Sequence, residues 1–201
     1  MACPIDGGAP MNRLLIVGAG GHGRSVAEMV LLAGQHELAG FVDDTFPGLT
    51  QVWGLPVLGT TAILADYRIH ANSAIVALGN NRLREELHER LRAAGFRLIT
   101  AIHPTAIVSP KAVIGPGSTI MAGAIVGTEA RLGEGVIVNS GAVVDHHCQV
   151  EDFGHLGVNA CMAGGAVLGR GAWMQAGAAL GYGVKIASRT VLAPGEAIAS
   201  N

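Results

Sequence analysis

The carboxy-terminal half of the chain has an aliphatic residue or methionine at every sixth position, without interruption from Ile102 to Ile198. An amphipathic helix would repeat its apolar positions about every 3.6 residues, and a half-buried strand would repeat them at every second residue. A period of six fits neither pattern. It predicts a short strand and a turn in each hexad, with successive strands rotated onto new faces, so that three hexads close one triangular coil.

Two further features agree with such a coil. A small residue lies four positions after most of the aliphatic ones, and a glycine often follows them directly, as Gly115 follows Ile114 and Gly133 follows Leu132. Small side chains suit a narrow interior, and glycine adopts the positive φ of tight corners without steric cost. We therefore predict that residues 102–201 form a parallel β-helix of a little over five coils, in which each inward side chain lies above the one eighteen residues earlier.

The amino-terminal half alternates strand-like and helical patterns instead. Apolar runs predict three strands, at 14–17, 38–42 and 74–78. Helical patterns follow the first and third of them, at 24–33 and 82–94. Alternation of this kind predicts a small α/β domain of the Rossmann-like type. We place this domain at 12–101, after a flexible segment at 1–11.

The first predicted strand ends in the sequence GAGGHG at 18–23, directly before a helix. In such a unit the glycines let the backbone approach a phosphate, and the helix amino terminus offers free N–H groups and a positive dipole end. Asp43 and Asp44 end the second strand, where a carboxylate commonly contacts ribose hydroxyls. Three strands make half of a doubly wound domain, so we expect one nucleotide rather than two. Tight packing without a ligand is the alternative.

Composition narrows the functional classes. Half of the 201 residues are hydrophobic and the formal net charge is −2, which argues against disorder and gives no basic footprint for nucleic acid. No apolar run approaches the roughly 20 residues of a membrane helix, and residues 1–11 lack the features of a signal peptide. Cys3, Cys148 and Cys161 show no CxxC spacing, which favours free thiols. We expect a cytoplasmic protein that binds neither nucleic acid nor membrane.

One dense polar cluster lies within the repeat, with the sequences DHHC at 145–148 and EDFGH at 151–155. Since position 144 points inward, His146 and His147 are expected near a corner or on the outer wall. A neutral imidazole takes a proton from an amine or hydroxyl near neutral pH, which makes His146 a candidate general base. A metal site is the alternative, but neighbouring positions of the repeat point in different directions. His146, His147 and His155 are therefore not expected to converge within one subunit, and we expect no metal.

Five segments carry a resemblance to a known family: GAGGHG at 18–23, FVDD at 41–44, ALGNNRLR at 77–84, IHPTAIV at 102–108 and VDHHCQVEDFGHLGVNACMAGG at 144–165. In this order they resemble the NeuD/PglD-type bacterial sugar acyltransferases, and the resemblance runs from about residue 13 to 198. It implies a small Rossmann-like nucleotide-sugar-binding domain followed by a left-handed parallel β-helix built from hexapeptide repeats.

The resemblance also implies an activity and an assembly. The expected enzyme is a homotrimeric N-acetyltransferase that uses acetyl-CoA as co-substrate, without a tightly bound cofactor, and acts on an amino sugar linked to a nucleotide, UDP in the first instance. The sugar amine attacks the thioester directly, so no covalent enzyme intermediate is needed, and Cys148 and Cys161 are expected to be buried small residues. An O-acetyltransferase of sialic acid or a related sugar, and a catalytically weak nucleotide-sugar-binding trimer, are the alternatives.

Individual residues follow from the matched positions. The catalytic group comprises His146 as general base, His147 beside it and Asn139 near the acceptor. Nucleotide-sugar contacts are implied at Gly20, Gly21, His22, Asp43, Asp44, Gly79 and Asn80. Contacts to acetyl-CoA are implied at His155, at the backbone N–H of Gly164, where it would stabilise the oxyanion, and at Ala176 and Pro194 along the CoA channel.

The chain departs from the family pattern at two places. The residue after the catalytic histidine is acidic in PglD-like enzymes and is His147 here. Asp145 precedes His146 and Glu151 lies nearby in sequence, so the group that orients the imidazole stays open. The sequence also ends at Asn201 without the family's usual carboxy-terminal arm. Either the natural chain is longer or the adenine end of CoA is held differently.

Overall fold

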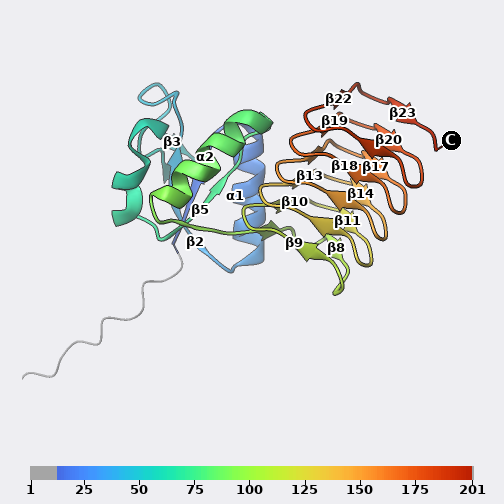
Figure 1. Ribbon diagram of the computed structural model, residues 1–201. Helices are drawn as coiled ribbons and strands as arrows, with labels where there is room; N and C mark the ends of the chain where they lie inside the picture. The colour runs from blue at the N-terminus through green and yellow to red at the C-terminus, as the bar shows by residue number, and fades with distance from the viewer. Residues whose placement is uncertain (1–12, 201) are drawn as a thin grey trace, which may run out of the picture.

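The computed structural model describes residues 13–200, so the segment at 1–11 for which we expected flexibility lies outside the described residues. Two units follow one another along the chain: a small α/β domain and a three-sided parallel β-helix, which lie side by side (Figure 1). Within the described residues, no helix combines the length and the apolar character that a bilayer crossing requires.

The α/β domain is built on a parallel sheet with the strand order β2-β1-β5-β6. Its strands are β1 (Arg13–Val17), β2 (Glu37–Val42), β5 (Ser73–Val76) and β6 (Arg97–Leu98). The first three agree with the predicted strands. The fourth has only two residues, too few for a recognisable apolar run. A small hairpin of β3 (Gln51–Val52) and β4 (Leu55–Pro56) and a 3-10 segment (Thr61–Ile69) lie between β2 and β5.

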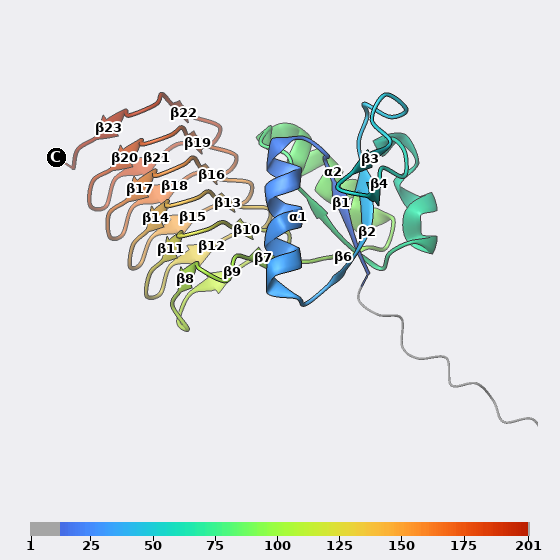
Figure 2. The same cartoon turned by 180° about the vertical axis from the view of Figure 1, so that it is seen from behind.

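Alternating side chains of β1 supply the cores on the two faces of this sheet. Leu14 and Ile16 pack under α1 (Gly21–Ala33), and Leu15 and Val17 pack with residues of α2 (Asn81–Ala93) and of the 3-10 segment. The first core continues into the β-helix, because Met121 belongs to the same buried cluster. The helix α1 therefore lies between the sheet and the β-helix, as Figure 2 shows from behind.

Three parallel sheets form the sides of the β-helix, and each is made of two-residue strands from successive coils. The first, which we call the docking face, contains β7 (Ala101–Ile102), β10 (Thr119–Ile120), β13 (Ile137–Val138), β16 (His155–Leu156), β19 (Trp173–Met174) and β22 (Val191–Leu192). The second, the apolar face, contains β8 (Ile107–Val108), β11 (Ile125–Val126), β14 (Val143–Val144), β17 (Cys161–Met162), β20 (Ala179–Leu180) and β23 (Ala197–Ile198). The third face contains β9 (Val113–Ile114), β12 (Arg131–Leu132), β15 (Gln149–Val150), β18 (Val167–Leu168) and β21 (Lys185–Ile186).

The predicted stacking of eighteen residues per coil is confirmed by the strand register. Val126 pairs with Val108 below it and Val144 above it, and the same step recurs in all three sheets. The residues of the hexad series fill the interior, where most are at most 4% exposed from Ile120 to Leu192. Val108, Ile114, Ile186 and Ile198 are only partly buried, and Ile102 is the most exposed of the series at 40%. It lies in the first coil, which has no coil beneath it to complete the packing.

Cysteine placement corrects one expectation. Cys148 is buried in the interior as expected, but Cys161 is exposed. Position 161 directly precedes the inward Met162, so its side chain points outward from β17, because successive residues of a strand face opposite sides. Cys161 therefore belongs to the surface of the apolar face.

The helix α2 lies along one edge of the β-helix, which we call the helix corner. This corner is formed by residues one coil apart with positive φ, namely Gly117, Gly135, Phe153, Gly171 and Arg189. Arg84 of α2 is 1% exposed, and its guanidinium donates to the carbonyls of Gly135 at 2.8 Å and Phe153 at 2.7 Å. Asn81 donates to the carbonyl of Gly171 at 2.9 Å. One helix thus ties three coils to the α/β domain.

Close contact between α1 and β1 gives a first testable prediction. A Cβ at Gly23 would lie 1.9 Å from the carbonyl oxygen of Gly18, whereas a Cβ at Gly21 would meet nothing within 4 Å. Gly23→Ala should therefore lower the free energy of unfolding by about 1–3 kcal/mol, the usual cost of overpacking. Gly21→Ala, in the same helical turn, should cause no loss. Urea denaturation followed by circular dichroism compares the two, and equal stabilities would contradict the prediction.

Candidate active site

The glycine loop opens at the carboxyl end of β1 and leads into α1. Gly20 is the N-cap of α1 and has no side chain that could satisfy the first N–H groups. Gly20 and Gly21 are exposed, and a Cβ at either would meet no atom within 4 Å. The amino-terminal turn of α1 is therefore exposed and has no side-chain cap, an arrangement that favours an anionic ligand.

Asp43 and Asp44 hold the neighbouring loops in place. Asp43 accepts from the backbone N–H of Ala19 at 2.7 Å and from the hydroxyl of Thr45 at 2.6 Å. Asp44 accepts from the N–H and the hydroxyl of Thr61 at 2.7 and 3.0 Å. Burial alone would raise the pKa of Asp43, but the hydrogen bonds from Thr45 and Ala19 outweigh it and lower that pKa. Both carboxylates therefore stabilise the conformation of the neighbouring loops, a role that the sequence did not reveal.

Three basic side chains are buried together where the α/β domain meets the docking face. Burial, and secondly the charge of Arg84, lowers the pKa of His22 to about 4. Burial, followed by the charges of Arg84 and His22, lowers the pKa of His155 to about 3. Burial also lowers the pKa of Arg84 to about 9. Arg84 is thus the cation of this cluster near neutral pH, and both imidazoles are neutral.

A cavity of about 490 Å³ adjoins this cluster. Its lining includes Gly79 and Asn80 from the end of β5, Arg82 from α2, and Trp173 and Arg189 from the β-helix. The indole of Trp173 stacks on the ring of His155, with centroids 5.4 Å apart and an interplanar angle of 16°. Of the predicted contacts, Gly79 and Asn80 therefore line one interdomain cavity with an aromatic wall and two arginines, and His155 lies behind that wall, stacked on Trp173.

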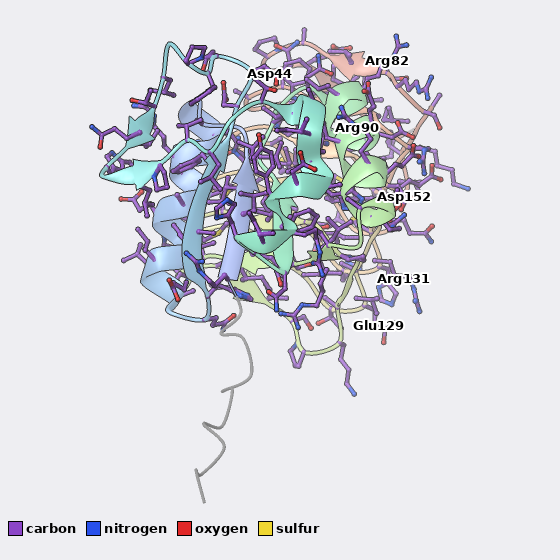
Figure 3. The ribbon with its side chains drawn as sticks, turned by 90° about the vertical axis from the view of Figure 1, so that its left-hand side faces the viewer. Asp44, Arg82, Arg90, Glu129, Arg131 and Asp152 are labelled. Atoms are coloured by element: carbon purple, nitrogen blue, oxygen red, sulfur yellow. The ribbon has the colours of Figure 1, made fainter. Side chains whose placement is uncertain are left out.

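His146 and His147 lie on a different edge of the β-helix, between the apolar and third faces, which we call the histidine corner. The two Nδ1 atoms are 2.9 Å apart, and Nε2 of His147 lies 3.0 Å from a carboxylate oxygen of Glu129. Nε2 of His146 lies 3.7 Å from a carboxylate oxygen of Asp145. In Figure 3 the labelled Glu129 lies far from the labelled Asp44 of the α/β domain.

Gly164 lies one coil above His146, and its lack of a side chain creates the space for the imidazole. A Cβ at Gly164 would lie 2.4 Å from Cε1 of His146. The remaining predicted residues, Asn139, Ala176 and Pro194, lie at the corner between the docking and apolar faces, which we call the asparagine corner. Ala176 and Pro194 are exposed and stand one coil apart.

Comparisons with known proteins agree with this architecture. Residues 13–91 match the family model described as the PglD N-terminal domain. The GDP-perosamine N-acetyltransferase of Escherichia coli O157:H7 is 30% identical over 180 residues, with 80% of each chain covered. The UDP-N-acetylbacillosamine N-acetyltransferase of Bacillus subtilis is 39% identical over 115 residues, which span 56% of this chain and only 52% of that protein.

Among solved structures, a perosamine N-acetyltransferase variant from Caulobacter crescentus, in complex with CoA and GDP-perosamine, superimposes with a TM-score of 0.88. It is 36% identical to this chain, and the match covers 92% of this chain and 87% of that one. This chain belongs to the NeuD/PglD-type family of sugar acetyltransferases. The predicted fold class, a small Rossmann-like domain followed by a left-handed parallel β-helix, is thereby confirmed.

A single protomer brings some of the predicted site residues together and leaves others apart. The nucleotide-side residues gather with His155 beside the docking face, whereas His146 and His147 lie at the histidine corner and Asn139 at the asparagine corner. The expectation that His146, His147 and His155 diverge within a subunit is corrected in part, because His146 and His147 are in contact. No group of three or more potential metal-ligating side chains is found between residues 13 and 200.

Four residues of the site escaped the sequence analysis. Arg84 and Trp173 belong to the buried cluster and the cavity, Glu129 reaches His147, and Glu85 holds Arg170 at 2.6 Å across the helix corner. The signal for Glu129 was present, because it lies eighteen residues before His147 and therefore one coil below it. Glu151, which is near His146 in sequence, accepts from the backbone N–H of Arg170 at 2.8 Å, on another edge.

The buried imidazoles predict a pH dependence of stability. An unfolded histidine has a pKa of about 6.5, so between pH 6.5 and about 4 the unfolded chain binds protons that folded His22 and His155 do not. The free energy of unfolding should fall in this range as the pH drops, by at most about 1.4 kcal/mol per pH unit for each histidine.

His155→Phe tests this effect, because the phenyl ring keeps the stacking on Trp173 but does not titrate. Urea denaturation at pH 7, 6, 5 and 4 should give a shallower loss of stability for this variant than for the wild type. Parallel curves would show that His155 does not contribute to the pH dependence.

Proposed function

We propose that this protein is an acetyl-CoA-dependent N-acetyltransferase that acts on an amino sugar linked to UDP or GDP. The observation that carries the proposal is the interdomain cavity, because it lies between the glycine loop side of a nucleotide-binding domain and a β-helix of acetyltransferase type. The named substrates of the relatives, GDP-perosamine and UDP-N-acetylbacillosamine, support the same substrate class.

In this proposal the nucleotide lies along the carboxyl ends of β1, β2 and β5. The N–H groups after Gly20 bind a phosphate, and His22, Asp43 and Asp44 border the site. Gly79 and Asn80 lead into the cavity at Trp173. Because Arg84 is buried and remains a cation near neutral pH, its field favours the negative diphosphate.

We further propose that the chain works as a homotrimer assembled through the apolar face. The outward side chains of that face are Ile107, Ile125, Val143, Cys161, Ala179 and Ala197. Ile107 is 65% and Ile125 37% exposed in one protomer. A continuous apolar surface of this kind typically marks a protein–protein interface. The α/β domain covers the docking face and leaves the apolar face open.

A threefold arrangement of these faces brings the separated groups together. If three apolar faces surround one axis, the histidine corner of each protomer meets the asparagine corner of the next. His146 then lies beside a neighbour's Asn139, Ala176 and Pro194, at a seam suited to the extended acetyl-CoA molecule. The neighbour's α/β domain lies on the far side of that same corner and can present the sugar amine to His146.

The reaction is then direct acyl transfer. The lone pair of the neutral sugar amine attacks the thioester carbonyl carbon, and the carbonyl electrons move onto oxygen. His146 accepts the amine proton at Nε2. When the carbonyl re-forms, the carbon–sulfur bond breaks and the CoA thiolate takes that proton from His146, so the enzyme returns to its starting state. The N–H of Gly164 is proposed to stabilise the oxyanion.

His146→Ala should lower kcat by roughly 10²–10⁴-fold, which is the usual contribution of a general base. Thiol release from acetyl-CoA is measured with a panel of UDP- and GDP-linked amino sugars, and free sialic acid tests O-acetylation. The control is His70→Ala, which replaces a histidine that belongs to the α/β domain and lies away from both corners. Wild-type kcat in His146→Ala would rule out the general-base assignment, and no thiol release by the wild type with any amino sugar would rule out the activity.

Ile125→Glu should disrupt the proposed trimer, because it places a charge within the apolar face. Sedimentation velocity should show a trimeric wild type and a predominantly monomeric variant with an intact circular dichroism spectrum. Arg131→Glu, on the outward side of the third face, is the matched control and should remain trimeric. A trimeric Ile125→Glu protein would place the interface elsewhere.

A further inference from the structure

A chain of three side chains crosses two coils at the histidine corner. The carboxylate of Glu129 lies 3.0 Å from Nε2 of His147, and Nδ1 of His147 lies 2.9 Å from Nδ1 of His146. Glu129 and His147 are one coil apart, and both adopt a left-handed backbone, with φ of 61° and 59°. The next two positions of the same column are Gly165 and Gly183. The fold thus holds a glutamate and a histidine in contact at positions where the following coils have glycine.

With Glu129 ionised and both imidazoles neutral, hydrogen-bond chemistry allows one consistent proton arrangement along this chain. An ionised carboxylate only accepts, so Nε2 of His147 carries the proton that faces Glu129. In a neutral imidazole the other nitrogen is then an acceptor, so Nδ1 of His147 accepts from Nδ1–H of His146. The Nε2 lone pair of His146 is left free, which is the form that a general base requires.

Asp145 does not provide this arrangement. One of its carboxylate oxygens accepts from the backbone N–H of His146 at 2.7 Å. The other lies 3.7 Å from Nε2 of His146, which is beyond hydrogen-bond distance. A hydrogen bond there would also hold a proton on the nitrogen that must receive one. The charge of Asp145 lies close enough to stabilise an imidazolium once it forms.

We infer that Glu129 and His147 are positioning residues that together fix the tautomer of His146 and stabilise its charged form. The inference rests on the proposed function and names a specific device for the same site. During the reaction, Nε2 of His146 takes the amine proton, while Nδ1–H keeps its bond to His147 and His147 keeps its bond to Glu129. No proton leaves the chain, and the positive charge on His146 is balanced through His147 by the Glu129 carboxylate. The proton later passes from Nε2 to the CoA thiolate.

A double-mutant cycle tests the inference. Glu129→Gln keeps the shape but removes the charge, and should lower kcat roughly 10- to 100-fold, a part of what a general base contributes, with KM for both substrates unchanged. His147→Glu places a carboxylate directly beside His146. In that background Glu129→Gln should have no further effect, because the route through His147 no longer exists. Glu89→Gln, which removes the same charge from an exposed position of α2, controls for net charge.

Two kinetic results would overturn the inference. One is a wild-type kcat for Glu129→Gln. The other is that Glu129→Gln lowers kcat equally in the wild type and in the His147→Glu variant. That result would show that Glu129 acts independently of His147.

A second readout does not depend on activity, and it separates failure of this inference from failure of the proposed function. Nitrogen-15 NMR of histidine-labelled protein, with His146 assigned from His146→Ala, reports which ring nitrogen carries the proton. The Nδ1–H tautomer is expected for His146 in the wild type, with a shift toward Nε2–H in Glu129→Gln. An Nε2–H tautomer in the wild type would overturn the inference even if acetyl transfer is fully active, and the expected tautomer would uphold it even if the substrate class proves wrong.

Discussion

The backbone hydrogen bonds between successive coils are the constraint on which the rest of the structure depends. Each strand donates to and accepts from the coils beside it, as when Ile125 N–H donates to the carbonyl of Ala142 at 2.9 Å. This ladder places every residue over the one eighteen positions earlier. It therefore decides that Gly164 lies over His146, that Glu129 lies beneath His147, and that five residues with positive φ form a straight edge for α2.

The second determinant is a buried guanidinium at that edge. Arg84 donates to three carbonyls, those of Leu78, Gly135 and Phe153, and so joins the α/β domain to two coils. Leaving a buried guanidinium without partners would be costly, so the carbonyls and the arginine require one another. Burial lowers the pKa of His22 and His155, and the charge of the same cation lowers both further. Arg84 thus contributes both to the attachment of the domains and to the electrostatics of the buried cluster beside the cavity.

Much of the fold could be predicted because its signals are local or strictly periodic. The hexad series identified which side chains point inward, and the strand-loop-helix pattern around the glycine loop identified β1 and α1. β6 could not be found, because two residues carry no pattern. The roles of Arg84 and Trp173 depend on how two separately folded units dock, and this is not encoded at any fixed spacing. Asp44 was recognised as a site residue, but its bonds to Thr61 join positions seventeen apart in an irregular segment.

The connection between the two units is short and firmly held. Only Ile99 and Thr100 separate β6 from β7; Ile99 is 8% exposed, and the hydroxyl of Thr100 donates to the carbonyl of Gly115 at 2.9 Å. With α2 fastened as well, the α/β domain cannot swing relative to the coils. If such rigid protomers assemble as the proposed trimer, the span from the nucleotide-binding side of one protomer to His146 of the next is constant. The enzyme then acts as a molecular ruler, on which only a sugar whose amine stands at the correct reach from its diphosphate meets the acetyl group.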